Sequence, residues 1–325
     1  MDGFYNRKEA GELLEKYTQG RLKYLHRSLQ VQEMYNGQNS YKIMNEGAIY
    51  RLIKVSTTES DGSVEEVTAA IQGIIYSSDI PPIYSKYPHS VNPRHLRQSL
   101  GITALNTDSF EAIYTVIAEI YNTFKLELGS VLDKCTVFSD FEGHRALDVY
   151  NRYLSSREHT PPEQIRPIDT VIDPHGYLSI AAGNKFVYSE DNVVDYYKLK
   201  DQNKSDEYSF ERCRPTNFQI GDIVEIQISF AALPLRGNRF KLGLILRSVA
   251  LLDNSISRRA SVSRLATQID RPISNSNIII KRKAVYVEEE VSSTRAKLDH
   301  ITFGAMDINE KTGDKRGNFM DTDNS

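Results

Sequence analysis

A run of positive charge in the second half of the chain is the clearest candidate for chemistry. Residues 236–264 include seven Lys and Arg residues, opposed only by Asp253. Arg239, Lys241 and Arg247 share one parity, so a strand would place them on one face. Cations that follow phosphates, with aromatic rings that stack on bases, are how open β-surfaces hold single-stranded nucleic acid. The pattern predicts a nucleic-acid-binding surface formed by Arg236, Arg239, Phe240, Lys241 and Arg247.

A simpler interpretation of the same residues stays open. A solvated strand face followed by a flexible basic tail would carry the same charges without binding anything. The whole chain has a net charge of −3, so only a local patch would attract a polyanion. Tyr196 and Tyr197, in a preceding hairpin, could add base-stacking rings or simply pack half-buried.

Arg258-Arg259-Ala260-Ser261 resembles a target of basophilic kinases, which makes Ser261 a candidate phosphorylation site. A phosphate there would add about −1.5 to −2 charges and cancel part of the basic patch. Motifs this short also arise by chance.

The other reactive side chains form no recognisable catalytic or metal-binding set. The seven histidines and two cysteines lack CxxC, HxxxH or HExxH spacing, so we expect no metal and no cofactor. A carboxylate pair such as Asp169 and Asp173 could coordinate Mg²⁺ for phosphoryl or nuclease chemistry, but Asp173-Pro174-His175-Gly176 is more simply a turn. P-loop, Rossmann and serine-hydrolase motifs are absent from the sequence. These patterns favour a binding protein over an enzyme.

The elements that would position the basic residues form a long hairpin at residues 218–253. Gly221-Asp222 begins a strand with apolar residues on both faces, and Arg236-Gly237-Asn238 is a turn before a second such strand. Runs typical of strands, separated by turn signals, extend this module back to about residue 165. We therefore predict a β-rich module at 165–253, with antiparallel pairing.

The first 158 residues are predicted to be mainly helical. Apolar residues recur at helical spacing over 5–36 and most clearly over 109–128, where Asp108 is the expected N-cap. A third helix is expected near 143–154, a strand pair between residues 48 and 76, a short strand near 136–138, and a linker at 159–167. Together with the β-rich module, these elements predict an α+β fold.

The remainder of the chain, 254–325, is predicted to be a polar and largely disordered tail. The N-terminal residues are charged and contain no secretory signal, and no run of 18 apolar residues occurs. We therefore expect no membrane contact and a nuclear or cytoplasmic location.

Two resemblances rest on the block FQIGDIVEIQISFAALPLRGNRFKLGLILRSVALLD at 218–253. The block, with YSEDNVVDYY upstream, resembles an uncharacterised multi-copy protein family of mushroom-forming fungi, which implies no activity. It also resembles the last two strands of the OB-fold in viral single-stranded-DNA-binding proteins. That second resemblance implies a small barrel with backbone contacts at Arg239, Lys241 and Arg247, and base stacking at Phe240.

The sequence therefore predicts a non-enzymatic protein that binds single-stranded DNA or RNA through a basic β-surface. The alternative is a protein-interaction or assembly protein without nucleic-acid affinity, whose exposed strands would contact protein partners. A metal-dependent nuclease or transposition enzyme is a third and weaker hypothesis.

Overall fold

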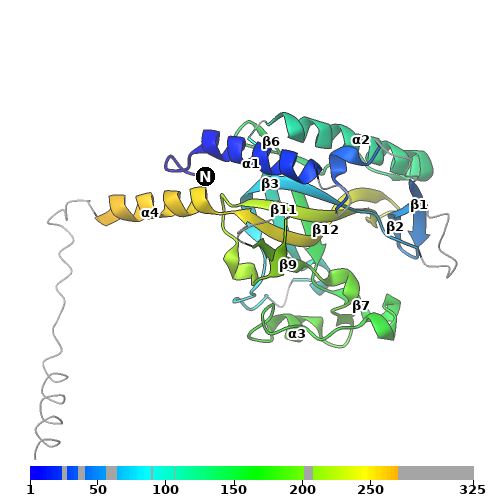
Figure 1. Ribbon diagram of the computed structural model, residues 1–325. Helices are drawn as coiled ribbons and strands as arrows, with labels where there is room; N and C mark the ends of the chain where they lie inside the picture. Colours follow the sequence, from blue (N-terminus) through cyan, green and yellow to red (C-terminus); the bar gives the residue numbers. More distant parts are fainter. Residues whose placement is uncertain are drawn as a thin grey trace, which may run out of the picture. The chain divides into compact units, whose positions relative to one another are not determined.

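The computed structural model describes residues 1–23, 28–35, 41–55, 64–88, 91–105, 107–200 and 208–269. They form a large mixed sheet flanked by helices (Figure 1). The four helices are α1 (Arg7–Leu22), α2 (Asp108–Leu128), α3 (Tyr177–Ala182) and α4 (Ser255–Ile269). The first strands are β1 (Tyr41–Glu46), β2 (Ile49–Lys54), β3 (Thr68–Asp79), β4 (Arg97–Thr103), β5 (Phe138–Phe141) and β6 (His144–Arg152). The later strands are β7 (Ser155–Ser156), β8 (Phe186–Val187), β9 (Asp195–Leu199), β10 (Phe210–Arg212), β11 (Ile223–Pro234) and β12 (Phe240–Asp253).

The main sheet has the strand order β1-β2-β11-β3-β4-β6-β12-β9-β10, and β5 pairs with β6. β11 also pairs with β12, so the pairing circuit β3-β4-β6-β12-β11 returns to its starting strand. Most of these pairs are antiparallel. The contact between β6 and β12 is parallel and consists of one residue pair, Tyr150 with Ile245. We call this contact the seam.

The hairpin predicted at 218–253 is confirmed as β11 and β12, two long strands that pair with each other and with further strands of the sheet. Both strands are buried along nearly their whole length because other strands pair on either side of them. A register shift between Gln227 and Ile228 leaves Arg247 of β12 without a partner on β11, so Arg247 is the extra residue of a β-bulge.

Helix α2 confirms the helix predicted at 109–128. Its buried residues, including Phe110, Ile113, Ile117, Ile120 and Phe124, join the main core. The expected capping role of Asp108 is wrong, since Thr107 holds the N-cap position. Asp108 is the first helical residue, where its carboxylate complements the positive end of the helix dipole.

Helix α1 ends at Leu22, so the helix expected over 5–36 is too long; Val31–Glu33 form a separate 3₁₀ turn. Near the end of α1, Arg21 is buried and donates two hydrogen bonds to Glu225 of β11, at 2.6 and 2.8 Å. Helices α1 and α2 lie on the same side of the sheet in Figure 1 and meet where Ser109 donates to Glu15 at 2.7 Å.

The helix expected near 143–154 is wrong, because these residues form β6. Its Ala146, Leu147, Val149 and Asn151 are buried, with β4 on one side and β5 on the other. Pairing on both edges outweighs the weak local preference of this segment. The N-terminal region predicted to be mainly helical therefore supplies seven strands, and the main sheet takes strands from both halves of the chain.

The first part of the predicted β-rich module has little strand structure. Residues 157–192 form three 3₁₀ turns, helix α3 and the two-residue strand β8, around a second small core that includes Leu96, Tyr153, Leu154, Leu178 and Tyr188. The linker expected at 159–167 lies in these turns.

Within the predicted tail, residues 255–269 form helix α4, which is docked by the buried Ile256 and Ala260. The rest of that predicted tail, 270–325, lies outside the described residues. No helix of the described part is long and apolar enough to cross a membrane.

Candidate nucleic-acid interface

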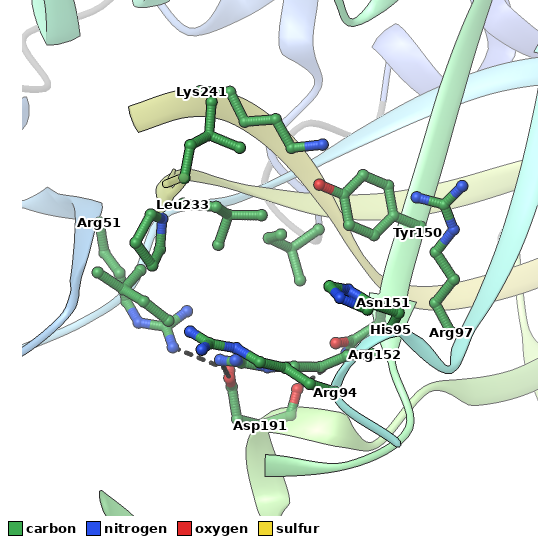
Figure 2. Close-up of a pocket in the computed structure, with 14 residues that line it drawn as sticks. Arg51, Arg94, His95, Arg97, Tyr150, Asn151, Arg152, Asp191, Leu233 and Lys241 are labelled. Carbon is green, nitrogen blue, oxygen red and sulfur yellow. Dashed lines mark hydrogen bonds and ion pairs between the residues drawn. The ribbon is translucent and has the colours of Figure 1, made fainter. Parts of the chain in front are cut away.

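Tyr150 lies at the seam between β6 and β12, beneath two cations from neighbouring strands (Figure 2). The guanidinium carbon of Arg97, on β4, lies 5.1 Å from the ring centroid of Tyr150. The Nζ of Lys241, on β12, lies 5.5 Å from the same centroid. Three strands that are distant in the sequence thus place one ring and two positive charges together.

The backbone pairing explains this meeting. In the antiparallel β4–β6 ladder Arg97 is opposite Arg152 and Ser99 is opposite Tyr150, so Arg97 and Tyr150 are diagonal neighbours. Gly243 leaves room for the tyrosine: a Cβ there would come within 3.3 Å of the Tyr150 hydroxyl oxygen. Asn151 reinforces the seam by donating to the backbone oxygen of Leu246 on β12 at 3.2 Å.

Around Tyr150 the surface forms a groove of about 470 Å³, which we call the Tyr150 groove. Strands β2, β4, β6, β11 and β12 and the loop before β4 line it. Its charged side chains are Arg51, Arg94, Arg97, Arg152 and Lys241, against the single carboxylate Asp191. Within the described part of the chain, no carboxylate forms an ion pair with Arg94, Arg97 or Lys241. The groove therefore holds uncompensated positive charge.

Asp191 organises the remaining arginines at one end of the groove. Its carboxylate lies 3.0 Å from Arg51, 3.0 Å from Arg247 and 3.5 Å from Arg152. Burial opposes ionisation of Asp191, but the three arginines outweigh it and lower its pKa to about 2. Arg51 and Arg247 both also pair with Glu66, each at 2.8 Å. These two arginines belong to a closed ion cluster, whereas Arg94, Arg97 and Lys241 do not.

A second hollow of about 590 Å³ continues from the Tyr150 groove. The two share Ile49, Arg51, Arg94, Arg152, Asp191 and Pro234, so they form one continuous depression. The second hollow extends over β7, β8 and the 3₁₀ turns that follow β7.

The residues predicted to bind nucleic acid do not meet in one place. Lys241 lines the Tyr150 groove, and Arg236 is exposed in the turn between β11 and β12. Arg239 pairs with Asp133 at 2.9 Å, and Phe240 packs edge-on against Tyr50, with 5.2 Å between the ring centroids. Arg247 turns inward at the bulge, where it donates to Ser229 and to the backbone oxygen of Asp191.

Sequence reasoning missed most of the groove: Arg51, Arg94, Arg97, Tyr150 and Arg152. The segment Pro93-Arg94-His95-Leu96-Arg97 did offer a signal, because its cations precede a strand and the loop around it is polar. Tyr150 and Arg152 offer no such signal, because the sequence predicts a helix for their segment.

The other candidates have structural partners. Asp173 accepts hydrogen bonds from the backbone nitrogen and hydroxyl of Ser179, and Asp169 accepts one from Val171. Among the residues that can be described, no group of three or more His, Cys, Asp or Glu side chains is placed to hold a metal ion. Ser261 lies within α4 and donates to the backbone oxygen of Ser257 at 3.0 Å. Its phosphorylation stays a prediction.

The chain matches no protein-family model and no curated protein. Among solved structures it is similar to gp2.5, a single-stranded-DNA-binding protein of bacteriophage T7, with 10% identity and a TM-score of 0.30 over 57% of this chain and 87% of that one. It is also similar to the single-stranded-DNA-binding protein of bacteriophage Enc34, with 12% identity and a TM-score of 0.30 over 74% and 96% of the two chains. A C-terminally truncated form of the Enc34 protein gives the same identity and score over 66% and 95%. At this level, none of these likenesses establishes a shared fold or function.

Proposed function

We propose that this protein binds single-stranded nucleic acid, without catalysis, in the Tyr150 groove. The observation that carries the proposal is a set of cations, Arg94, Arg97 and Lys241, gathered around one half-buried tyrosine ring with no carboxylate partner among the residues that the structure describes. Phosphates need such cations, and an unpaired base needs such a ring.

Arg97 and Lys241 can exchange the ring of Tyr150 for the phosphates of a bound strand. Arg97 and Lys241 are held near Tyr150 by cation–π attraction, which contributes about 0.5–2 kcal/mol. A phosphate attracts each of them more strongly, because it carries a full negative charge and accepts hydrogen bonds. When the two side chains turn toward phosphates, the ring of Tyr150 becomes free to stack on a base.

The ring also selects for single strands. Bases in a duplex are stacked and paired inside the helix, so a tyrosine on the floor of a groove reaches only bases that have left the stack.

We further propose that the pairing circuit β3-β4-β6-β12-β11 is an OB-like barrel. Its antiparallel pairs and one parallel contact give five strands the order 1-2-3-5-4, with the last returning to the first. In OB-folds the face of strands 2 and 3, with the loops joining strands 1–2 and 4–5, binds oligonucleotides. The corresponding strands here are β4 and β6, which carry Arg97, Tyr150 and Arg152.

Fluorescence anisotropy with a labelled single strand of about 30 bases tests the proposal at two salt concentrations. We expect binding that weakens as salt rises, and a variant with Arg97→Ala and Lys241→Ala that binds far more weakly. A variant with Lys16→Ala and Arg258→Ala removes the same charge from exposed positions on α1 and α4 and serves as the matched control. Failure to bind at low salt, or equal losses in both variants, would contradict the proposal.

Self-assembly is the second candidate function, favoured by the exposed Val262 and Leu265 on α4. Light scattering over a range of protein concentrations tests it. A mass that rises with concentration, and falls when both residues are changed to Ser, would support assembly; a constant monomer mass would exclude it.

A further inference from the structure

The second hollow has the composition of a pocket for one nucleobase, and the inference rests on the function proposed above. Its walls include Pro161, Phe186 and Pro234, which offer apolar surface to the flat faces of a ring. Its volume of about 590 Å³ is within the usual range for small-molecule sites.

Two polar side chains in this hollow have unused hydrogen-bonding capacity. Within the described residues, the side-chain amide of Gln164 has no hydrogen-bond partner, so both its oxygen and its nitrogen are available. His159 uses Nδ1 toward the Ser156 hydroxyl at 3.2 Å, which leaves its Nε2 available. A base edge presents donors and acceptors side by side, and a glutamine amide matches those of adenine with two parallel hydrogen bonds.

The wall of this hollow is held in place by a buried polar network. The side-chain oxygen of Asn192 accepts from the backbone nitrogen of Ser189 at 2.9 Å and from its hydroxyl at 2.9 Å. The side-chain nitrogen of Asn192 donates to Ser155 at 3.1 Å. Since Ser155 and Ser189 both line the hollow, the pocket is preorganised and a ligand loses little free energy in shaping it.

Two arginines lie at the junction of the two hollows. Arg94 and Arg152 line both the Tyr150 groove and the second hollow, so they lie where the two meet. Successive bases of a strand are joined through one phosphate. We therefore propose that a strand stacks one base on Tyr150, passes its phosphate across Arg94 and Arg152, and inserts the next base into the second hollow, where Gln164 favours adenine.

The test compares single strands of about 12 thymidines whose central residue is replaced by adenosine or by an abasic site. For the unchanged protein we expect the adenosine strand to bind about tenfold more tightly than the abasic strand. Gln164→Ala should remove this preference while leaving the affinity for the abasic strand unchanged. Gln219→Ala changes an exposed glutamine elsewhere and should keep the preference.

Phe186→Leu is the second variant, because it keeps the hollow apolar while removing the ring. We expect it to weaken binding of the adenosine strand and not of the abasic strand. If the Gln164 and Phe186 variants bind the adenosine strand and the abasic strand with equally reduced affinity, the two residues have a merely structural role. That result would overturn the base pocket.

The possible failures are distinguishable. Salt-sensitive binding that depends on Arg97 and Lys241 but shows no adenosine preference would overturn the base pocket and leave the proposed function standing. No binding of any strand by the unchanged protein would overturn both.

Discussion

The Tyr150 groove and the β9–β10 edge each place an arginine over a tyrosine, and the two surfaces differ in charge compensation. In the Tyr150 groove, Arg97 lies over Tyr150 and Lys241 approaches the same ring, without carboxylate partners among the described residues. At the β9–β10 edge, Arg212 lies 5.9 Å from the centroid of Tyr197, but it also pairs with Asp195 at 3.2 Å. Lys198 at that edge pairs with Glu211 at 2.9 Å. The comparison shows that Arg97 and Lys241 can turn toward a phosphate without leaving a carboxylate of the described residues, whereas Arg212 cannot.

The strongest test removes the three unpaired cations together. Changing Arg94, Arg97 and Lys241 to Ala should weaken single-strand binding on the order of a hundredfold or more, because each loses a charged hydrogen bond to phosphate. The slope of log affinity against log salt should become shallower by about 2, since each cation contributes about 0.7. Anisotropy titrations at several salt concentrations measure both quantities.

The control for that variant is a triple change of paired cations, Lys198, Arg212 and Arg259 to Ala. It removes the same total charge and should leave the salt slope nearly unchanged. Equal effects of the two triple variants would show that binding depends on net charge alone and would break the comparison.

Removing the rings gives the next largest effect. Tyr150→Ala should weaken single-strand binding by about 2 kcal/mol, or roughly thirtyfold, because one stacked base loses its ring. Tyr150→Phe should keep most of the affinity. Tyr197→Ala is the matched change at the compensated edge, and any loss as large as that of Tyr150→Ala would contradict the assignment of the groove.

Two carboxylates extend the comparison to stability. Asp191 has three arginine partners. Asp222 is fully buried and accepts hydrogen bonds from Ser257 and Gln219, and no cation of the described residues forms an ion pair with it. Burial is the largest cause that raises the pKa of Asp222 to about 6, despite those hydrogen bonds. The folded state therefore binds a proton more readily than the unfolded state does, so the free energy of unfolding falls as the pH rises from about 4 to 6.

We expect this fall to be about 1–2 kcal/mol and to be much smaller in Asp222→Asn. Urea unfolding at pH 4, 5, 6 and 7 measures it. If the free energy of unfolding falls with pH as steeply in the variant as in the unchanged protein, Asp222 is not the cause of the fall.

The smallest expected effect is a gain of affinity. Asp191→Asn removes the negative charge that occupies Arg51, Arg152 and Arg247, so these arginines attract phosphate more strongly. We expect single strands to bind about threefold more tightly. Asp195→Asn, which frees Arg212 at the other surface, should not change the affinity. Weaker binding by Asp191→Asn would show that Asp191 is needed to position the arginines.

The sequence predicts the parts of this fold that local patterns control. The apolar residues on both faces of 223–253 can be buried only in the centre of a sheet, and the stripe over 109–128 fits only a helix. The same reasoning fails for residues 144–152, because they form a strand only through pairing with β4 on one edge and β5 on the other. Their alternation is too irregular to indicate a strand, because the neighbours Ala146 and Leu147 are both buried and the polar Asn151 is buried as well.

The candidate site was harder to predict than the fold. Lys241 was found because it belongs to a local run of cations, but Arg97 and Tyr150 come from other strands, and only the β4–β6–β12 pairing brings the three together. Arg239 and Arg247 look like Lys241 in the sequence. Their carboxylate partners Asp133, Glu66 and Asp191 are distant in the chain, so their compensation could not be foreseen.

The buried pair of Arg21 and Glu225 has a consequence for how the chain is made. During synthesis Arg21 emerges 204 residues before Glu225, and until then its charge has no such partner and must stay in water. Helix α1 cannot dock in its final position before β11 has been synthesised. The first helix to be synthesised is therefore among the last elements to dock. A domain that completes folding only after most of its chain has been synthesised exposes apolar surface until then. In this protein that surface includes the face of α1 that carries Leu14, which is buried in the main core of the folded protein.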